Sequence, residues 1–192
     1  MNSTINKPQI IATVKNQGDL DAALQSQCQT IFILFGNICN IGRIVNQVKM
    51  AGKSAFVHVD FLEGAANKNI VIEFLSIVSK ADGIISTKSS MIKAAKAHDL
   101  ISIQRIFMID SITYHNIDQQ VAQSKPDCIE LMPGAMPKVI RWVTDKVNIP
   151  VIAGGLVCDE EDALAAFKAG ANAISTTNQQ VWALAETGCK VK

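Results

Sequence analysis

The sequence predicts a small single domain of the (β/α)8 class, a TIM barrel. Its 192 residues suffice for one domain with a substantial core, and 48% of them are hydrophobic. Short apolar runs of strand length alternate eight times with segments of helical periodicity. This alternation is typical of parallel strands joined by crossover helices, and eight units close a barrel. The alternative is an open doubly wound sheet, which would explain glycine-rich turns but does not require eight units.

The expected strands are short segments of Val, Ile, Leu, Phe and Ala. That composition suits strands covered on both faces, as in a parallel sheet. In chain order they lie at residues 10–14, 30–35, 55–59, 83–86, 104–109, 127–131, 149–153 and 171–176. One domain spans residues 1–192, and residues 1–8 are expected to form a flexible lead-in.

The segments between the strands carry apolar residues at helical spacing. Asp19 can cap the first helix, Gly52 and Gly170 can end two others, and Pro137 suits a first turn. The fifth helix is polar and is expected from about Asn116. The positions expected to face the core are Leu20, Ala23, Leu24, Ile41, Ile44, Val45, Val48, Val71, Phe74, Leu75, Val78, Met91, Ala94, Ala95, Met136, Val139, Ile140, Val143, Leu164, Phe167, Val181, Trp182 and Leu184.

The net charge and the cysteine pattern limit the partners and the cellular compartment that the sequence predicts. The net charge is +1, so a nucleic acid or membrane partner would need a local basic patch. Such a patch is one interpretation of Lys93 with Lys96, or of Lys138 with Arg141 and Lys146; solvated helix faces are the other. The five cysteines form no CxxC pair or metal-ligand spacing, so we expect reduced, mostly buried thiols in a cytoplasmic protein. No signal peptide or membrane-spanning run is visible.

Two neighbouring strand ends predict a phosphate site. Gly154 and Gly155 follow the seventh strand and allow a close approach of the backbone. Ser175 and Thr176 end the eighth strand just before a helical segment. Exposed N–H groups and the positive end of a helix dipole attract anions, and barrels often bind phosphate after strands seven and eight.

Polar residues at other strand ends would share the same rim. Glu130 is the strongest candidate for a functional residue among them. A charged group inside an apolar strand is unfavourable unless it is paired or faces a polar mouth. Asp60 and Lys88 are further candidates for ligand contact, although Asp60 and Asp110 could instead cap their loops. His58 is either an interior histidine with satisfied hydrogen bonds or a ligand contact.

No catalytic arrangement emerges from these residues. Spacing suggests neither a Ser–His–Asp triad nor a metal centre, and Lys88 would form a Schiff base only if burial lowered its pKa. The residues therefore predict a barrel that binds a small phosphorylated polar molecule, and they leave open whether it transforms that molecule.

Six segments, taken in order, carry a resemblance to a known family. They are residues 58–64 (HVDFLEG), 83–88 (GIISTK), 104–111 (QRIFMIDS), 127–134 (DCIELMPG), 152–156 (IAGGL) and 175–177 (STT) with 181–182 (VW). This set resembles the glycerol uptake operon antiterminators, which are glycerol-3-phosphate-responsive regulators of bacteria. The resemblance extends over about residues 9–184.

The resemblance implies a cytoplasmic regulator rather than an enzyme. It implies transcription antitermination through binding to the leader mRNA of glycerol-utilisation genes, with glycerol 3-phosphate as effector and without a cofactor, a metal or a membrane partner. Gly154, Gly155, Ser175 and Thr176 would hold the phosphate, and Asp60, Lys88 or Glu130 would contact the glycerol hydroxyls. No basic RNA-binding module or aromatic platform is apparent in the sequence, and a homodimer is a further hypothesis.

Two alternatives remain. One is a TIM-barrel enzyme, such as an isomerase, an aldolase or a prenyl transferase, acting on a small phosphorylated substrate. The other is a module that binds a phosphorylated metabolite and acts through a protein partner. Dependence of RNA binding on glycerol 3-phosphate, or turnover of a phosphorylated triose, separates these classes.

Overall fold

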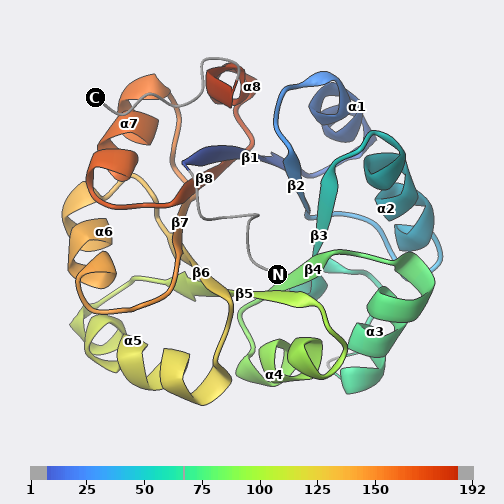
Figure 1. The fold of residues 1–192 in the computed structure, drawn as a ribbon, viewed down its shortest axis with the longest axis horizontal. Helices are drawn as coiled ribbons and strands as arrows, with labels where there is room; N and C mark the ends of the chain where they lie inside the picture. The colour runs from blue at the N-terminus through green and yellow to red at the C-terminus, as the bar shows by residue number, and fades with distance from the viewer. Residues whose placement is uncertain (1–7, 67, 186–192) are drawn as a thin grey trace.

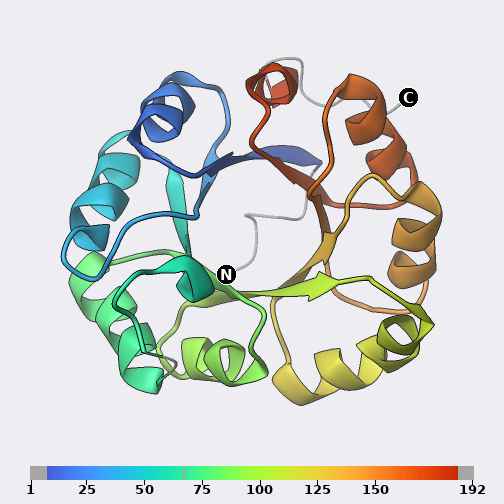
Figure 2. The ribbon, with the colours of Figure 1, turned by 180° about the vertical axis from the view of Figure 1, so that it is seen from behind.

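The protein is a closed barrel of eight parallel strands surrounded by helices (Figures 1 and 2). The computed structural model describes residues 8–66 and 68–185, so almost all of the expected lead-in lies outside the described residues. The strands pair in chain order, and β1 pairs with β8 to close the ring. The predicted TIM-barrel class is therefore confirmed, and the open sheet is excluded.

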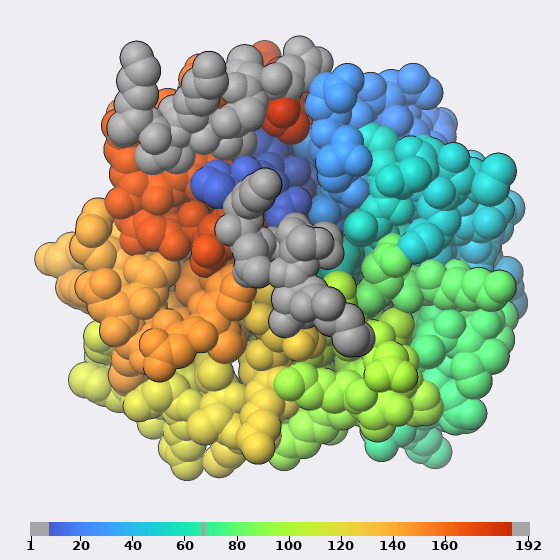
Figure 3. Space-filling model, in the orientation of Figure 1, coloured from blue at the N-terminus to red at the C-terminus, as the bar shows by residue number. Residues whose placement is uncertain are grey.

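The strands are short and are joined by helical connections. They are β1 (Gln9–Val14), β2 (Thr30–Ile33), β3 (Ser54–His58), β4 (Gly83–Ser86), β5 (Ile101–Phe107), β6 (Cys128–Met132), β7 (Val151–Gly154) and β8 (Ala173–Thr176). The helices are α1 (Gln17–Gln25), α2 (Ile41–Met50), α3 (Asn69–Phe74), α4 (Ser89–Ala97), α5 (Ser111–Ser124), α6 (Pro137–Thr144), α7 (Glu160–Lys168) and α8 (Gln179–Trp182). Successive parts of the chain follow one another around the molecule (Figure 3).

Side chains from every strand fill the barrel interior with one apolar layer. Its members are Ile11, Phe32, Phe56, Ile85, Ile103, Cys128, Ile152 and Ala173. Burial, with a contribution from Asp127, raises the pKa of the Cys128 thiol to about 12, so this cysteine is a small apolar side chain. The other large cluster of apolar residues includes strand and helix side chains that pack between the ring and the outer helices.

A polar layer of side chains lies above this apolar layer, toward the carboxyl ends of the strands. Residues two positions apart in a strand face the same side of the sheet. Two residues beyond Ile11, Ile103, Cys128 and Ala173, the chain places Thr13, Arg105, Glu130 and Ser175. The interior therefore becomes polar toward the carboxyl ends of the strands, where barrel sites form.

Local hydrogen bonds move several helix boundaries from their expected positions. Asp110 accepts a hydrogen bond from the backbone N–H of Thr113 at 2.8 Å, so α5 begins at Ser111, ahead of Asn116. The cap of α1 is Asn16 rather than Asp19.

The third helical segment also departs from the expected burial pattern. It passes into a π-helical turn, η2 (Leu75–Ser79), which changes the helical phase. Val78 is 62% exposed as a result, whereas Ile72 is fully buried. Among the cysteines, Cys28 and Cys128 are buried as expected, but Cys39 and Cys158 are exposed, and Cys189 lies outside the described residues.

Candidate functional site

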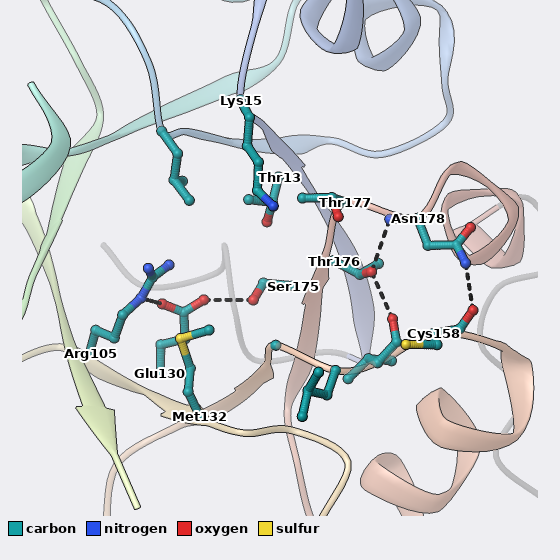
Figure 4. A pocket seen from close by; sticks show the side chains of 14 residues that line it. Thr13, Lys15, Arg105, Glu130, Met132, Cys158, Ser175, Thr176, Thr177 and Asn178 are labelled. Carbon is teal, nitrogen blue, oxygen red and sulfur yellow. Dashed lines mark hydrogen bonds and ion pairs between the residues drawn. The ribbon is translucent and has the colours of Figure 1, made fainter.

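A cavity of about 450 Å³ opens at the mouth of the barrel. β1, β5, β6 and β8 and the loops after β7 and β8 supply its walls (Figure 4). The lining residues are Thr13, Lys15, Leu34, Arg105, Glu130, Met132, Gly155, Leu156, Val157, Cys158, Ser175, Thr176, Thr177 and Asn178. Its size is typical of a site for a small molecule.

A buried chain of three side chains forms the floor of this cavity. Arg105 Nε donates to Glu130 Oε2 at 2.6 Å, and Ser175 Oγ donates to Glu130 Oε1 at 2.6 Å. The Arg105 and Glu130 side chains are 5% and 1% exposed. They lie directly opposite each other in the register of β5 and β6. Glu130 is therefore both an ion-pair partner and part of the polar mouth, with each carboxylate oxygen occupied.

Arg105 is a site residue that the sequence analysis did not single out. Its signal is the same as that of Glu130, a charged residue inside an apolar strand. Because Nε is committed to Glu130, the terminal nitrogens have no hydrogen-bond acceptor among the described residues. They are therefore donors available to a molecule in the cavity.

Thr13 presents a buried hydroxyl to the cavity. The residue is 6% exposed, and its Oγ1 has no hydrogen-bond partner within the described residues. A buried polar group without a partner destabilises a protein by about 1–3 kcal/mol. A ligand hydroxyl bound here would relieve that penalty.

Gly154 and Gly155 serve two different purposes beside the cavity. A Cβ atom on Gly154 would lie 2.4 Å from Ser175 Oγ and 2.7 Å from Glu130 Oε1, so only glycine leaves room for that hydrogen bond. Gly155 has a φ of 71°, in the left-handed region that favours glycine. Its backbone N–H and that of Thr177 make no hydrogen bond within the described chain, so both can bind an anion.

Thr176 joins the two loops that border this part of the cavity. Its Oγ1 donates to the Val157 carbonyl at 2.9 Å and accepts from the Asn178 N–H at 3.0 Å. Its own carbonyl accepts the indole N–H of Trp182 at 2.8 Å. The following helix α8 has only four residues, so its dipole is weaker than the sequence analysis expected.

Asp60 and Lys88 do not line the cavity. Asp60 follows β3, and its carboxylate accepts from Ser86 Oγ at 2.7 Å and from the Thr87 N–H and Oγ1 at 2.8 and 2.7 Å. Burial raises the pKa of Asp60, but the hydrogen bonds outweigh burial and hold it below its usual value. Lys88 precedes α4, and its N–H donates to Ser86 Oγ at 3.1 Å.

His58 is an interior histidine, but its hydrogen bonds are not satisfied. It is 2% exposed, and neither ring nitrogen has a partner among the described residues. Its ring centroid lies 4.5 Å from that of Phe61. Burial, reinforced by the charge of Arg105, lowers the pKa of His58 to about 3 against the opposing effect of Asp60. The imidazole is therefore neutral at physiological pH.

The described part of the chain lacks two further classes of site. No group of three or more His, Cys, Asp or Glu side chains there is arranged to hold a metal ion. No helix in that part is both long and apolar enough to cross a membrane.

Comparison with known proteins shows the family of the chain. Residues 10–182 match the family model described as glycerol-3-phosphate responsive antiterminator. A protein of Escherichia coli (strain K12), described as uncharacterized protein YgcP, is 60% identical over 177 residues, which cover 92% of this chain and 93% of that one.

Two solved structures are also similar. The glycerol uptake operon antiterminator regulatory protein of Listeria monocytogenes str. 4b F2365 has a TM-score of 0.87 at 36% identity, covering 91% of this chain and 94% of that one. A glycerol uptake operon antiterminator-related protein of Thermotoga maritima MSB8 has a TM-score of 0.82 at 30% identity, covering 92% of this chain and 98% of that one.

Proposed function

Because the chain belongs to the glycerol-3-phosphate responsive antiterminator family, we propose that its cavity binds glycerol 3-phosphate and that the bound form acts on RNA. The RNA is the leader of glycerol-utilisation genes, where binding prevents premature termination of transcription. Both the effector and the leader RNA are molecules of the cytoplasm, where we place this activity.

The phosphate of the effector binds between the loops after β7 and β8. The unused N–H groups of Gly155 and Thr177 supply hydrogen bonds there. Lys15, directly after β1, supplies positive charge beside the end of the neighbouring strand β8 (Figure 4). Ser175 and Thr176 contribute less directly, because their hydroxyls already bond to Glu130 and Val157. Gly154 allows that arrangement to form.

The glycerol hydroxyls bind on the floor of the cavity. Arg105 offers its terminal nitrogens as donors, and Thr13 Oγ1 both donates and accepts. Glu130 holds the guanidinium in place and raises the selectivity for a polar ligand. Asp60 and Lys88 are left out of the ligand set because neither lines the cavity.

The occupied carboxylate of Glu130 is the observation that favours sensing over turnover. A general base needs a free acceptor within reach of the substrate proton. Both oxygens of Glu130 already accept a hydrogen bond at 2.6 Å, and the Arg105 ion pair holds the carboxylate, so fewer acceptor sites remain for a substrate proton. The neutral His58 does not line the cavity, so it is not placed to exchange a proton with a bound ligand.

Calorimetric titration with glycerol 3-phosphate, inorganic phosphate and glycerol tests the ligand. We expect glycerol 3-phosphate to bind most tightly, since it engages both parts of the cavity. Equal affinity for inorganic phosphate would contradict recognition of the glycerol part.

Titration of a labelled leader transcript, with and without glycerol 3-phosphate, tests the RNA function. We expect the effector to tighten RNA binding, because a ligand shifts a protein only toward the state that it binds better. RNA binding that is absent in both conditions, together with turnover of a phosphorylated triose, would favour the enzyme alternative.

A further inference from the structure

The outer surface of α5 and α6 carries a cluster of aromatic and basic side chains. We call it the α5–α6 surface and define it by Tyr114 and His115 of α5, Lys138 and Trp142 of α6, and Lys146 just after α6. The two helices are neighbours around the ring (Figure 1). Trp142 is 44% exposed, which is unusual for so large an apolar side chain.

The two larger rings form one pair. The centroids of Tyr114 and Trp142 lie 5.7 Å apart at an interplanar angle of 51°. Lys138 Nζ lies 5.2 Å from the Trp142 ring centroid, and Lys146 Nζ lies 4.9 Å from the Tyr114 ring centroid. Each ring therefore has a cation beside it.

Hydrogen bonds fix the base of this surface. Lys146 Nζ donates to the carbonyls of Tyr114 and His115, each at 3.0 Å, and pairs with Asp118 at 3.2 Å. Arg141 donates to the Lys168 carbonyl at 2.8 Å. Because these bonds join α5 to α6 and α6 to the end of α7, the rings are held in place before a partner arrives.

This chemistry fits unpaired nucleobases rather than a duplex or a protein surface. Bases stack on aromatic faces regardless of their sequence, and nearby lysines meet the phosphates. A protein interface is also enriched in aromatic residues, but it is broader and its core is depleted of charged residues such as the two lysines here. Exposed aliphatic residues occur at Ile70, Ile77 and Val78 of α3 and η2, in a different sector of the ring, and at Ile109 and Ile112 around the start of α5.

We propose that the α5–α6 surface binds single-stranded RNA by stacking a base on the exposed Trp142, whose ring the partly buried Tyr114 supports. The inference rests on the proposed function for its partner, and it adds the place of contact. Local charges are almost balanced, since α5, α6 and the residues just after α6 carry Asp118 and Asp145 as well as Lys138, Arg141 and Lys146. Stacking therefore dominates, and salt weakens binding less than it would at a strongly basic groove.

The same two strands carry this surface and the floor of the cavity. α5 follows β5, which holds Arg105, and α6 follows β6, which holds Glu130. At the ends of these strands Phe107 and Met132 are register partners, and the Met108 N–H donates to the Met132 carbonyl at 2.7 Å. Met132 lines the cavity. A ligand that engages Arg105 therefore contacts the strands from which α5 and α6 extend.

The test compares Trp142→Ala, Trp142→Phe and the control Ile77→Ala in titrations of the labelled leader transcript. Ile77 is a matched control because it is an exposed apolar residue, at 64%, in another sector of the barrel. We expect Trp142→Ala to weaken RNA binding by about ten- to a hundredfold, Trp142→Phe to retain most of it, and Ile77→Ala to leave it unchanged. Binding of glycerol 3-phosphate should be the same in all three variants.

The outcomes separate this inference from the function on which it rests. If the native protein binds the transcript and Trp142→Ala binds it equally well, the α5–α6 surface is not the contact, although the regulatory function stands. If Ile77→Ala alone weakens binding, the RNA lies over α3 and η2. If the native protein binds no transcript in either ligand state, both proposals fail. Equal binding of an RNA duplex by the native protein would overturn base stacking.

Discussion

The mouth of the barrel has two sides with similar residues and different properties. The open side, formed by Thr13, Gly155, Ser175 and Thr176, borders the cavity. The closed side, formed by His58, Asp60, Ser86 and Thr87, lies across β3 and β4 and does not line it. Both sides place hydroxyls at strand ends, and the sequence analysis assigned ligand contacts to both.

The two sides differ in whether their hydrogen-bond donors already have acceptors within the protein. On the closed side, Asp60 accepts every hydrogen bond that Ser86 and Thr87 direct at it, so the group is satisfied internally. On the open side, the N–H groups of Gly155 and Thr177 and the hydroxyl of Thr13 keep no partner within the described chain. Unsatisfied polar groups that line the cavity, rather than polar residues as such, mark the place for a ligand. The ring nitrogens of His58 on the closed side also have no partner among the described residues, but His58 does not line the cavity.

The largest expected effect comes from removing the acid that supports the open side. Glu130→Ala leaves Arg105 buried without its partner, and we expect a loss of about 3–5 kcal/mol in the free energy of unfolding. Urea denaturation measures it. The double variant Arg105→Met/Glu130→Leu should lose much less, because it leaves no uncompensated charge. A loss below about 1 kcal/mol for Glu130→Ala would show that the pair is not holding the floor of the cavity.

Removing the acid of the closed side should affect stability alone. Asp60→Ala leaves the donors of Ser86 and Thr87 without an acceptor, and we expect a loss of about 2–3 kcal/mol. Calorimetry should find an unchanged affinity for glycerol 3-phosphate. The matched control is Asp110→Ala, which removes only the exposed cap of α5 and should lose about 1 kcal/mol. Loss of ligand affinity in Asp60→Ala would move Asp60 back into the site.

The buried histidine of the closed side gives the protein a pH dependence. Its pKa is about 3 in the folded protein and near 6.5 when unfolded, so between these values the unfolded state binds the extra proton. The contribution of His58 to the free energy of unfolding is therefore fully present above about pH 6.5. It falls with decreasing pH, by about 2 kcal/mol between about pH 7.5 and about pH 5.

Denaturation at both pH values measures this effect, and His58→Leu is the comparison. That variant should lose most of the pH dependence, since the Asp60 carboxylate, with its lowered pKa, stays ionised over the whole range. An equal slope in both proteins would assign the proton uptake to another group.

The smallest expected effect separates the two sides most directly. Thr13→Val removes the unpaired hydroxyl of the open side, and we expect glycerol 3-phosphate to bind about fivefold more weakly, with the free energy of unfolding about 1 kcal/mol higher. Thr87→Val on the closed side should do the reverse, lowering stability and leaving affinity intact. Calorimetry and urea denaturation of both variants measure the contrast, which disappears if Thr13 does not contact the ligand.

The sequence predicted the barrel because alternation is a local property of each strand and helix. It predicted a special role for Glu130 for the same reason, since one acid interrupts an apolar run. Arg105 carries an equivalent signal. That Arg105 meets Glu130, however, depends on the register of β5 and β6, which neither segment reveals alone.

The ligand contacts expected at Asp60 illustrate the same limit. Its hydrogen-bond partners Ser86 and Thr87 lie 26 and 27 residues away in the chain. Composition at a strand end therefore indicates polarity but not whether that polarity is already satisfied. The unpaired Thr13 hydroxyl and the pairing of Tyr114 with Trp142 likewise exist only in three dimensions.

The hydrogen bond between Trp182 and Thr176 gives the protein an internal optical reporter. The chain has two tryptophans, and the indole of Trp182 is buried while bonded to a carbonyl of the cavity wall. Trp142 stands on the outer surface of α6. A change at the cavity would shift the emission of Trp182, whereas contact at the outer surface would quench that of Trp142. The proposed binding of effector and of RNA can thus be tested through two different tryptophans of the unlabelled protein.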